Sequence, residues 1–330
     1  MTSASKIKSI GGEQELVAPL HYGVTNSGRS SLRWALASLE LAGKMILLPD
    51  FLCEIITDVL QEHQIKTIPY AVNKDFSFSF SKEVVEASDA IYLIRYFGMN
   101  TTALCRAICD AQKPLIIDDV FGIEPPVIET QQPWCYFNSL RKISPIADYS
   151  QLISNQPLVS IQLGFLPEFS QAKYQAKSLK ADCLLHGKGE EQAYLALFNQ
   201  GELLLNATKT IFLPSAKSSV LVNEFYRQAS LECELRLQNL ATAKSILPVE
   251  LYADAPIDFP SFLPILLPQR DKVRHGLTAH QIFLAVHWPE VEGMPNSLSD
   301  SILSLPLDSR YSSEDIAFVC HRILELMDEM

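Results

Sequence analysis

The sequence predicts an α/β protein with a mostly parallel sheet flanked by helices, followed by a smaller α+β domain. Short apolar runs alternate with segments of helical periodicity between residues 30 and 117, an order typical of a sheet whose strands are joined by helices. Two long helical patterns follow, and a proline-rich stretch at 248–260 precedes a last segment of mixed pattern. We therefore expect a large domain over residues 1–240 and a small domain over 241–330.

Apolar spacing predicts each element in turn. Strands alternate apolar or β-branched residues over four to eight positions, whereas helices repeat them every three to four. The predicted strands are 45–49, 67–71, 76–80, 90–96, 114–117, 158–163, 262–267 and 302–305. The predicted helices are 30–41, 53–63, 102–111, 168–198, 218–240, 271–281 and 313–327.

Composition excludes several classes of partner. The chain has 38 acidic and 27 basic residues, a net charge of −11 that would repel a polyanion, so we expect no nucleic-acid partner. The seven cysteines lack metal-ligand spacing, so no metal is expected. Residues 1–16 lack the apolar segment of a signal peptide, and no apolar run reaches about 18 residues. We expect a cytoplasmic protein without a membrane partner.

Residues 26–32, with the sequence NSGRSSL, predict an anion-binding helix start. Gly28 lets the backbone approach an anion closely, and Arg29 and Ser30 follow it at the N-terminus of a helix. These residues would hold the phosphate of a cofactor. An ordinary serine cap on a helix is the alternative interpretation.

Two later segments supply carboxylates and an amine. Residues 115–119 read as a buried strand that ends in Asp118 and Asp119, at the sheet edge where ligands bind in α/β folds. Asp119 could pair with a protonated pyridine nitrogen, although solvated acids or a metal site would give the same pattern. Lys142 follows another apolar strand, with Ser139 three residues before it. Burial would make its amine a nucleophile and a base, whereas most lysines are solvated.

These segments resemble one known family. SGRSSLRWAL (27–36), LLPDFLC (47–53), IRYFGMN (94–100), LIIDDVFG (115–122) and FNSLRKISPIAD (137–148) are similar, in this order, to the DegT/StrS-type sugar aminotransferases. The segments AVHWP (285–289) and LSLPLDSRYSSEDI (303–316) resemble the end of the small domain in the same group. The resemblance spans nearly the whole chain and implies the fold-type-I architecture of enzymes that depend on pyridoxal 5′-phosphate (PLP).

The resemblance also implies roles for individual residues. Lys142 would form the Schiff base with PLP, Asp119 would contact the ring nitrogen, and Gly28, Arg29 and Ser139 would contact the phosphate. Phe51 is a candidate for stacking on the ring. Candidates for substrate contacts or for packing between domains are Arg95, Tyr96, His287 and Trp288. Members of the family transfer an amino group from glutamate to keto-sugars attached to nucleotides, as homodimers, in polysaccharide and glycoconjugate biosynthesis.

The chain departs from the family at three places. Gly122 stands where a Gln or His is usual, Cys53 where many relatives have an aromatic ring, and Tyr149 and Ser150 where many have two glycines. Two alternatives therefore stay open beside transamination. The protein could be a non-catalytic member of the fold, or a PLP-dependent sugar dehydratase.

Overall fold

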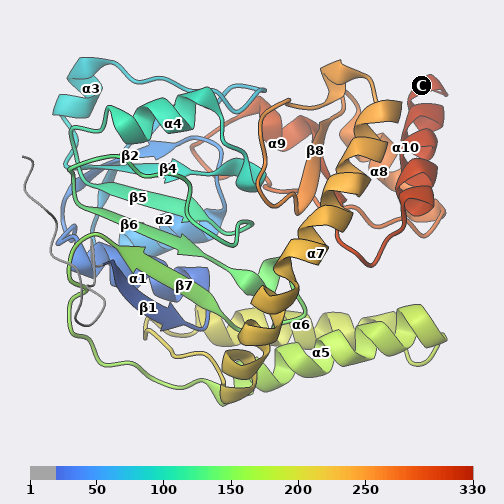
Figure 1. The fold of residues 1–330 in the computed structure, drawn as a ribbon, viewed down its shortest axis with the longest axis horizontal. Helices are drawn as coiled ribbons and strands as arrows, with labels where there is room; N and C mark the ends of the chain where they lie inside the picture. The colour runs from blue at the N-terminus through green and yellow to red at the C-terminus, as the bar shows by residue number, and fades with distance from the viewer. Residues whose placement is uncertain (1–19, 330) are drawn as a thin grey trace, which may run out of the picture.

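The computed structural model describes residues 20–329, so the expectations for residues 1–16 lie outside the described part. A seven-stranded sheet forms the centre of the large domain, in the order β1-β7-β6-β5-β4-β2-β3 (Figure 1). Its strands are β1 (His21–Thr25), β2 (Met45–Pro49), β3 (Lys66–Tyr70), β4 (Ala90–Ile94), β5 (Leu115–Asp119), β6 (Trp134–Asn138) and β7 (Ser150–Ser154). This architecture confirms the predicted α/β fold.

Five of these strands run parallel, and this brings their carboxyl ends to one edge of the sheet. The pairs β3-β2, β2-β4, β4-β5 and β5-β6 are parallel, whereas β7 is antiparallel to both β6 and β1. In the register, Ile94 pairs with Asp118, and Asp119 pairs with Asn138. The residues that follow β4, β5 and β6 are therefore spatial neighbours.

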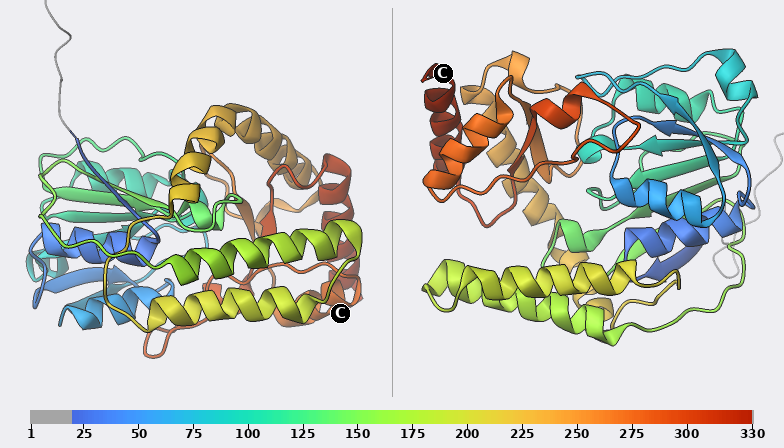
Figure 2. Two further views of the ribbon diagram at one scale, coloured as in Figure 1. Left: turned by 90° about the horizontal axis from the view of Figure 1, so that it is seen from below. Right: turned by 180° about the vertical axis from the view of Figure 1, so that it is seen from behind.

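Helices cover the sheet, and three further long helices follow β7. The first group comprises α1 (Gly28–Ser38), α2 (Glu54–Glu62), α3 (Lys82–Glu86) and α4 (Thr102–Cys109), with short 3₁₀ turns at η1 (Tyr96–Gly98) and η2 (Leu140–Lys142). The second comprises α5 (Pro167–His186), α6 (Glu191–Asn206) and α7 (Ala216–Ile246). Helices α5 and α6 run side by side as a hairpin that projects away from the sheet (Figure 2).

Helix α7 leads from the large domain into the small one (Figure 1). It buries Val222 in the core of the sheet and Ala243 in a second apolar core. The small domain contains η3 (Val249–Leu251), β8 (Phe262–Leu266), α8 (Arg270–Ala279), α9 (Ser297–Ser301), β9 (Ile302–Pro306) and α10 (Ser313–Asp328), with β8 and β9 antiparallel. A boundary at residue 240 would fall within α7 and stays a prediction.

Three sequence predictions of elements are wrong. Residues 158–163 form no strand, and the last strand of the sheet is instead β7, eight residues after Lys142. The helix expected at 168–198 is two helices, because Gly187 adopts a left-handed conformation (φ 61°) that ends α5. The Phe-Ser alternation at 76–80 makes only a single bridge, between Val72 and Phe78. Its aromatic rings pack into the core without extending the sheet.

A buried carboxylate joins the large helices to the end of η2. Asp148 is fully buried and accepts hydrogen bonds from the Ser170 hydroxyl (2.6 Å), the Ser215 backbone N–H (2.7 Å) and the Ser215 hydroxyl (2.8 Å). The Ser218 hydroxyl donates a further short hydrogen bond. Asp148 thus fixes the N-terminal turns of both α5 and α7 beside the chain that carries Lys142.

Replacing Asp148 by Ala should lower the free energy of unfolding by about 3 kcal/mol, because four buried or partly buried donors would lose a charged acceptor. Urea denaturation of the purified protein measures the loss. Ser219→Ala is the matched control, since its exposed hydroxyl contacts only a helix carbonyl. Equal effects of the two changes would contradict this role of Asp148.

Candidate active site

Three segments predicted to form one site come together at the carboxyl edge of the sheet. Asp119 ends β5, Lys142 ends η2 directly after β6, and α1 begins beside them. A Cβ atom added to Gly28 would lie 3.5 Å from the side chains of both Val120 and Phe137, so the start of α1 abuts the ends of β5 and β6. Fold topology thus places an amine, a carboxylate and a helix N-terminus in one region.

Lys142 is surrounded by groups that change its proton affinity. Burial lowers the pKa of its ammonium group, and the neighbouring Arg141 guanidinium lowers that pKa further. The amine lies 5.8 Å from the centroid of the Phe121 ring and has no hydrogen-bond or ion-pair partner within residues 20–329. A lowered pKa increases the fraction of the neutral amine, which is the form that acts as a nucleophile and a base.

Asp119 is the most constrained acid of the site. Its Oδ2 atom accepts a hydrogen bond from Arg95 Nη1 (3.0 Å) and from the Tyr136 hydroxyl (3.1 Å). Its Oδ1 atom is buried and has no partner among the described residues. Burial raises the pKa of Asp119, while the Arg95 guanidinium acts in the opposite direction. One buried oxygen is therefore left to accept a hydrogen bond from a ligand.

Asp118 has a different environment on the same strand. The Tyr92 hydroxyl donates to its Oδ2 atom (2.7 Å), and the Val120 backbone N–H donates to Oδ1 (3.3 Å). Burial raises the pKa of Asp118 to about 7, against the effect of the Tyr92 hydrogen bond. Asp118 is thus a core acid that is close to half protonated at neutral pH.

The start of α1 combines hydroxyls with an unpaired amide. The side chain of Ser27 caps the helix by accepting from the Ser30 backbone N–H, and both hydroxyls donate to Asn26 Oδ1. Asn26 Nδ2 is buried and without a partner among residues 20–329, so it can donate to an added anion. Ser139, which precedes η2, is also buried.

Three cations converge on one carboxylate near this helix start. Glu202 of α6 accepts from Arg29 (2.9 Å), Arg141 (3.0 Å) and Lys173 (2.7 Å). Burial raises the pKa of Glu202, but Arg141 and Lys173 outweigh it and hold that pKa at about 2. Three positive charges against one negative charge leave an excess of two, which favours an anionic ligand nearby.

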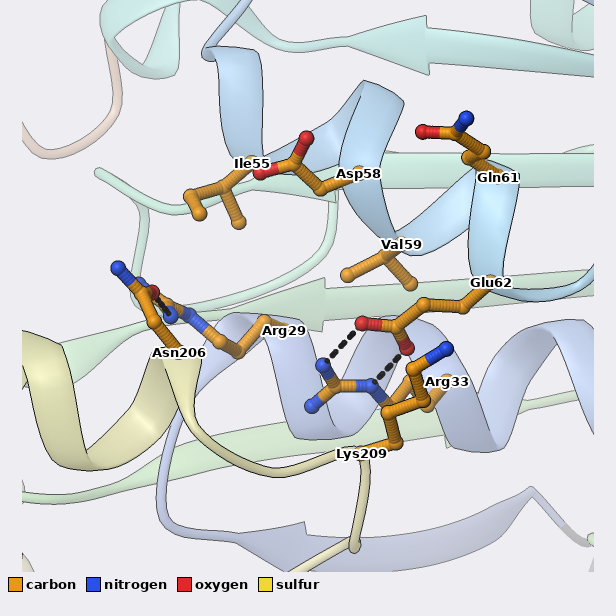
Figure 3. Close-up of a pocket in the computed structure, with 9 residues that line it drawn as sticks. All are labelled: Arg29, Arg33, Ile55, Asp58, Val59, Gln61, Glu62, Asn206 and Lys209. Carbon is orange, nitrogen blue, oxygen red and sulfur yellow. Dashed lines mark hydrogen bonds and ion pairs between the residues drawn. The ribbon is translucent and has the colours of Figure 1, made fainter.

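Arg29 also borders a pocket of about 510 Å³ between α1, α2 and the end of α6 (Figure 3). There Arg33 donates two hydrogen bonds to Glu62, at 2.7 and 2.8 Å. Neither Lys142 nor Asp119 lines this pocket. The pocket residues are Arg29, Arg33, Ile55, Asp58, Val59, Gln61, Glu62, Asn206 and Lys209.

An aromatic cluster closes the region from the side of the small domain. Trp288 makes an edge contact with Phe51 (centroids 5.4 Å apart) and stacks on Phe121 (6.0 Å). His287 lies 5.1 Å from Phe121, and burial together with Lys142 lowers the pKa of His287 to about 3. The indole Nε1 of Trp288 is buried without a partner among residues 20–329. His287 and Trp288 thus face the site across the domain boundary.

Phe51 and Tyr96 lie deeper in the core than the sequence suggests. The two rings stack on each other at 5.5 Å, Phe51 is fully buried, and the Tyr96 hydroxyl donates to the Phe51 carbonyl. Cys53 instead lies close enough to Lys142 to influence its pKa. The structure therefore packs Phe51 and Tyr96 against each other in the core.

Sequence reasoning did not assign Tyr136 or Glu202 to the site, and it left Arg95 open between a substrate contact and packing between domains. The structure places Arg95 at the end of β4, in an ion pair with Asp119. Tyr136 lies within a mostly apolar run of the sequence, and Glu202 lies in a segment with the ordinary composition of an amphipathic helix. Neither residue has a local sequence signal.

PLP fits the polar groups that the region presents. Asp119 Oδ1 is an acceptor for a ring N–H, Asn26 Nδ2 is a donor for a phosphate, and Lys142 is an amine with a lowered pKa. Each group is buried or partly buried and lacks a hydrogen-bond partner in the described chain.

Replacing Gly122 by Ala should destabilise the protein by about 2 kcal/mol and displace the Asp119 carboxylate. A Cβ atom at position 122 would lie 1.9 Å from Asp119 Oδ2, which overpacks a buried site. Gly28→Ala is the control, because its Cβ contacts would be ordinary. Thermal unfolding of both variants tests this, and an unchanged stability of the Gly122 variant would contradict the geometry.

Asp118 should make stability depend on pH. Its pKa rises from 3.8 to about 7 on folding, so the native state binds more protons between pH 4 and 7 and loses stability as the pH rises. Between pH 4 and 7 the free energy of unfolding of wild type should fall by on the order of 4 kcal/mol relative to that of Asp118→Asn. Urea denaturation of both proteins at several pH values measures this change. A difference in stability between wild type and Asp118→Asn that stays constant with pH would contradict the raised pKa.

Comparisons with known proteins agree at the level of fold. No family model matches the chain, and no curated protein matches it. Among solved structures, DesV from S. venezuelae, in complex with a ketimine intermediate, has a TM-score of 0.64 at 14% identity over 94% of this chain and 85% of its own. PseC from Helicobacter pylori, an aminotransferase of pseudoaminic acid biosynthesis, gives 0.60 at 13% identity, over 94% and 87%.

A DegT DnrJ EryC1 StrS aminotransferase from Brucella abortus gives a TM-score of 0.59 at 16% identity, over 93% of this chain and 86% of its own. Identities this low establish a shared fold. The chain has the fold-type-I architecture of the DegT/DnrJ/EryC1/StrS-type sugar aminotransferases.

Proposed function

We propose that the protein is a PLP-dependent aminotransferase. The observation that carries the proposal is the convergence of an amine of lowered pKa on Lys142 and a buried, unpartnered acceptor on Asp119 at one sheet edge. The fold belongs to an architecture whose solved examples include aminotransferases.

Each residue has a distinct task in this proposal. Bound PLP would supply an electron sink for a carbanion formed on the substrate. Lys142 Nζ would hold the cofactor covalently and, once released, would take up and return the proton of the substrate carbon. Asp119 Oδ1 would accept the ring N–H.

The start of α1 would hold the phosphate. The backbone N–H of Gly28 and the unpaired Asn26 Nδ2 would bind the anion at the helix N-terminus, whereas the Ser30 N–H is already bonded to the Ser27 side chain. Ser139 would donate its hydroxyl from the other side. Arg29 would act through the charge of the Glu202 cluster, because its guanidinium is already bonded to Glu202 and Asn206.

The small domain would contribute the substrate contacts. His287 is neutral at physiological pH because its pKa is about 3, and its Nδ1 atom is already bonded to the Ser304 hydroxyl (2.9 Å), so only Nε2 would bond the substrate. Trp288 offers an unpaired indole N–H and a flat ring, which together suit a sugar hydroxyl or a base. Tyr96 would support this surface by packing. A keto-sugar nucleotide with glutamate as donor, in cytoplasmic polysaccharide or glycoconjugate biosynthesis, is the substrate class that we propose.

We further propose a homodimer. Large apolar side chains are exposed along the neighbouring helices α5, α6 and α7. A group of exposed apolar side chains marks a surface that binds another protein chain. These side chains are Leu184, Leu185, Leu195, Leu203, Val220, Leu231, Leu235 and Leu237.

Within residues 20–329 no helix is long and apolar enough to cross a membrane.

One observation favours a non-catalytic protein as the second candidate. Phe121, next to Lys142, is fully buried and stacks on both Phe97 and Trp288, so apolar bulk stands beside the amine. A sugar dehydratase would use the same groups as the aminotransferase and differs only in the bond broken.

Reductive trapping tests the proposal. Borohydride treatment with PLP should attach the cofactor to Lys142, and Lys142→Ala should abolish both trapping and amino transfer from glutamate. Lys177 is the internal comparison, since burial also lowers the pKa of this lysine, to about 8. Trapping on Lys177 alone, or PLP bound at Lys142 that no amino donor converts, would contradict an aminotransferase.

A further inference from the structure

Arg95 makes an unusual set of contacts for a residue next to a proposed cofactor. Its guanidinium bonds Asp119 Oδ2 (3.0 Å), the Asn100 side chain (3.0 Å) and the Glu124 carbonyl (3.2 Å), and it pairs with Asp258. The side chains of Arg95 and Asp119 are 2% and 0% exposed. The ion pair is therefore withdrawn from solvent, where a charge interaction is strong.

The ion pair also fixes which oxygen of Asp119 remains free. Arg95 and the Tyr136 hydroxyl both occupy Oδ2, and Oδ1 is left buried without a partner in the described chain. A side chain at residue 122 would collide with both oxygens, at 1.9 and 2.6 Å. The absence of a side chain at Gly122 thus permits the rotamer that turns Asp119 towards Arg95.

Charge determines what this free oxygen can do. A carboxylate in a dry site without a counter-charge takes up a proton, and a neutral acid pairs with an unprotonated ring nitrogen. A guanidinium on the far oxygen stabilises the anionic form of Asp119, and this form pairs with a protonated ring nitrogen. Asp119 could therefore hold the proton on the ring only while Arg95 is in place.

We propose that Arg95 is a positioning residue, which keeps Asp119 ionised and turned so that Oδ1 alone accepts the ring N–H of PLP. The inference rests on the proposed function. It assigns to Arg95 and Gly122 a joint role, since Gly122 provides the space and Arg95 the charge. Asp258, in the segment that enters the small domain, and Asn100, between η1 and α4, both accept from the guanidinium, and Asn100 Nδ2 also donates to Asp258.

The test compares PLP with its carbocyclic analogue, in which a C–H group replaces the ring nitrogen. Both compounds carry the aldehyde and the phosphate, so the ratio of their dissociation constants isolates the ring N–H contact. Wild type should prefer PLP about tenfold to a hundredfold, as expected for a charged hydrogen bond. Arg95→Gln should reduce the preference to within about threefold of parity, and Arg95→Lys should retain more of it than Arg95→Gln.

Arg33→Gln is the matched control, because it breaks another arginine–carboxylate pair, between the buried Arg33 and the partly buried Glu62, and should leave the preference unchanged. Nitrogen NMR of ¹⁵N-labelled PLP on wild type covers the case in which Arg95→Gln does not fold, and it should show a protonated ring nitrogen at neutral pH. An unprotonated ring nitrogen in wild type, or an undiminished preference for PLP in Arg95→Gln, would overturn the inference about Arg95 without affecting the proposed function. A wild-type protein that binds neither compound would overturn the proposed function together with it.

Discussion

The buried pair of Asp119 and Arg95 is the interaction on which the rest of the site depends. It joins the ends of β4 and β5, reaches β6 through Tyr136, and reaches the small domain through Asp258. Desolvating two charges is costly, and their attraction offsets that cost only when the geometry is good and the other polar atoms are bonded. Every guanidinium nitrogen of Arg95 has a partner, whereas Asp119 keeps one oxygen unbonded in the described chain.

The fold produces this arrangement through parallel strands. Neighbouring parallel strands end at one edge, so Arg95, Asp119 and Lys142 come together although they are separated by more than twenty residues of sequence from one to the next. The long helices serve the same edge. Asp148 fixes the first turns of α5 and α7, and α6 brings Glu202 to the cations beside Lys142. Charge around Lys142 is thus controlled by elements far apart in sequence.

Much of the fold could be predicted because its signals are local. The apolar runs of β2 and β5 and the helical pattern of α10 are visible in the sequence, and the structure has these elements. The break at Gly187 was missed because both flanking segments have helical composition. The strand expected at 158–163 was misplaced because β7, SQLIS, is less apolar than the segment after it. Its burial comes from pairing with β1 and β6.

The site was predicted only in part, for a similar reason. Strand-end position made Asp119 and Lys142 recognisable, but it cannot reveal which oxygen of Asp119 is bonded or where Arg29 points. In the sequence, Gly122 and Cys53 lack side chains that are usual in the resembled family. In the structure, both positions affect groups of the site. Gly122 gives Asp119 its rotamer, and the Cys53 thiol contributes to the proton affinity of Lys142. Whether the chain catalyses amino transfer depends on contacts that no local pattern encodes.

A crystal structure of the protein with PLP would test the account most directly. We predict the ring nitrogen within hydrogen-bond distance of Asp119 Oδ1, the aldehyde carbon bonded to Lys142 Nζ, and Arg95 still paired with Oδ2. Density for the cofactor at another place, or an Asp119 carboxylate rotated away from Arg95 in the complex, would contradict it.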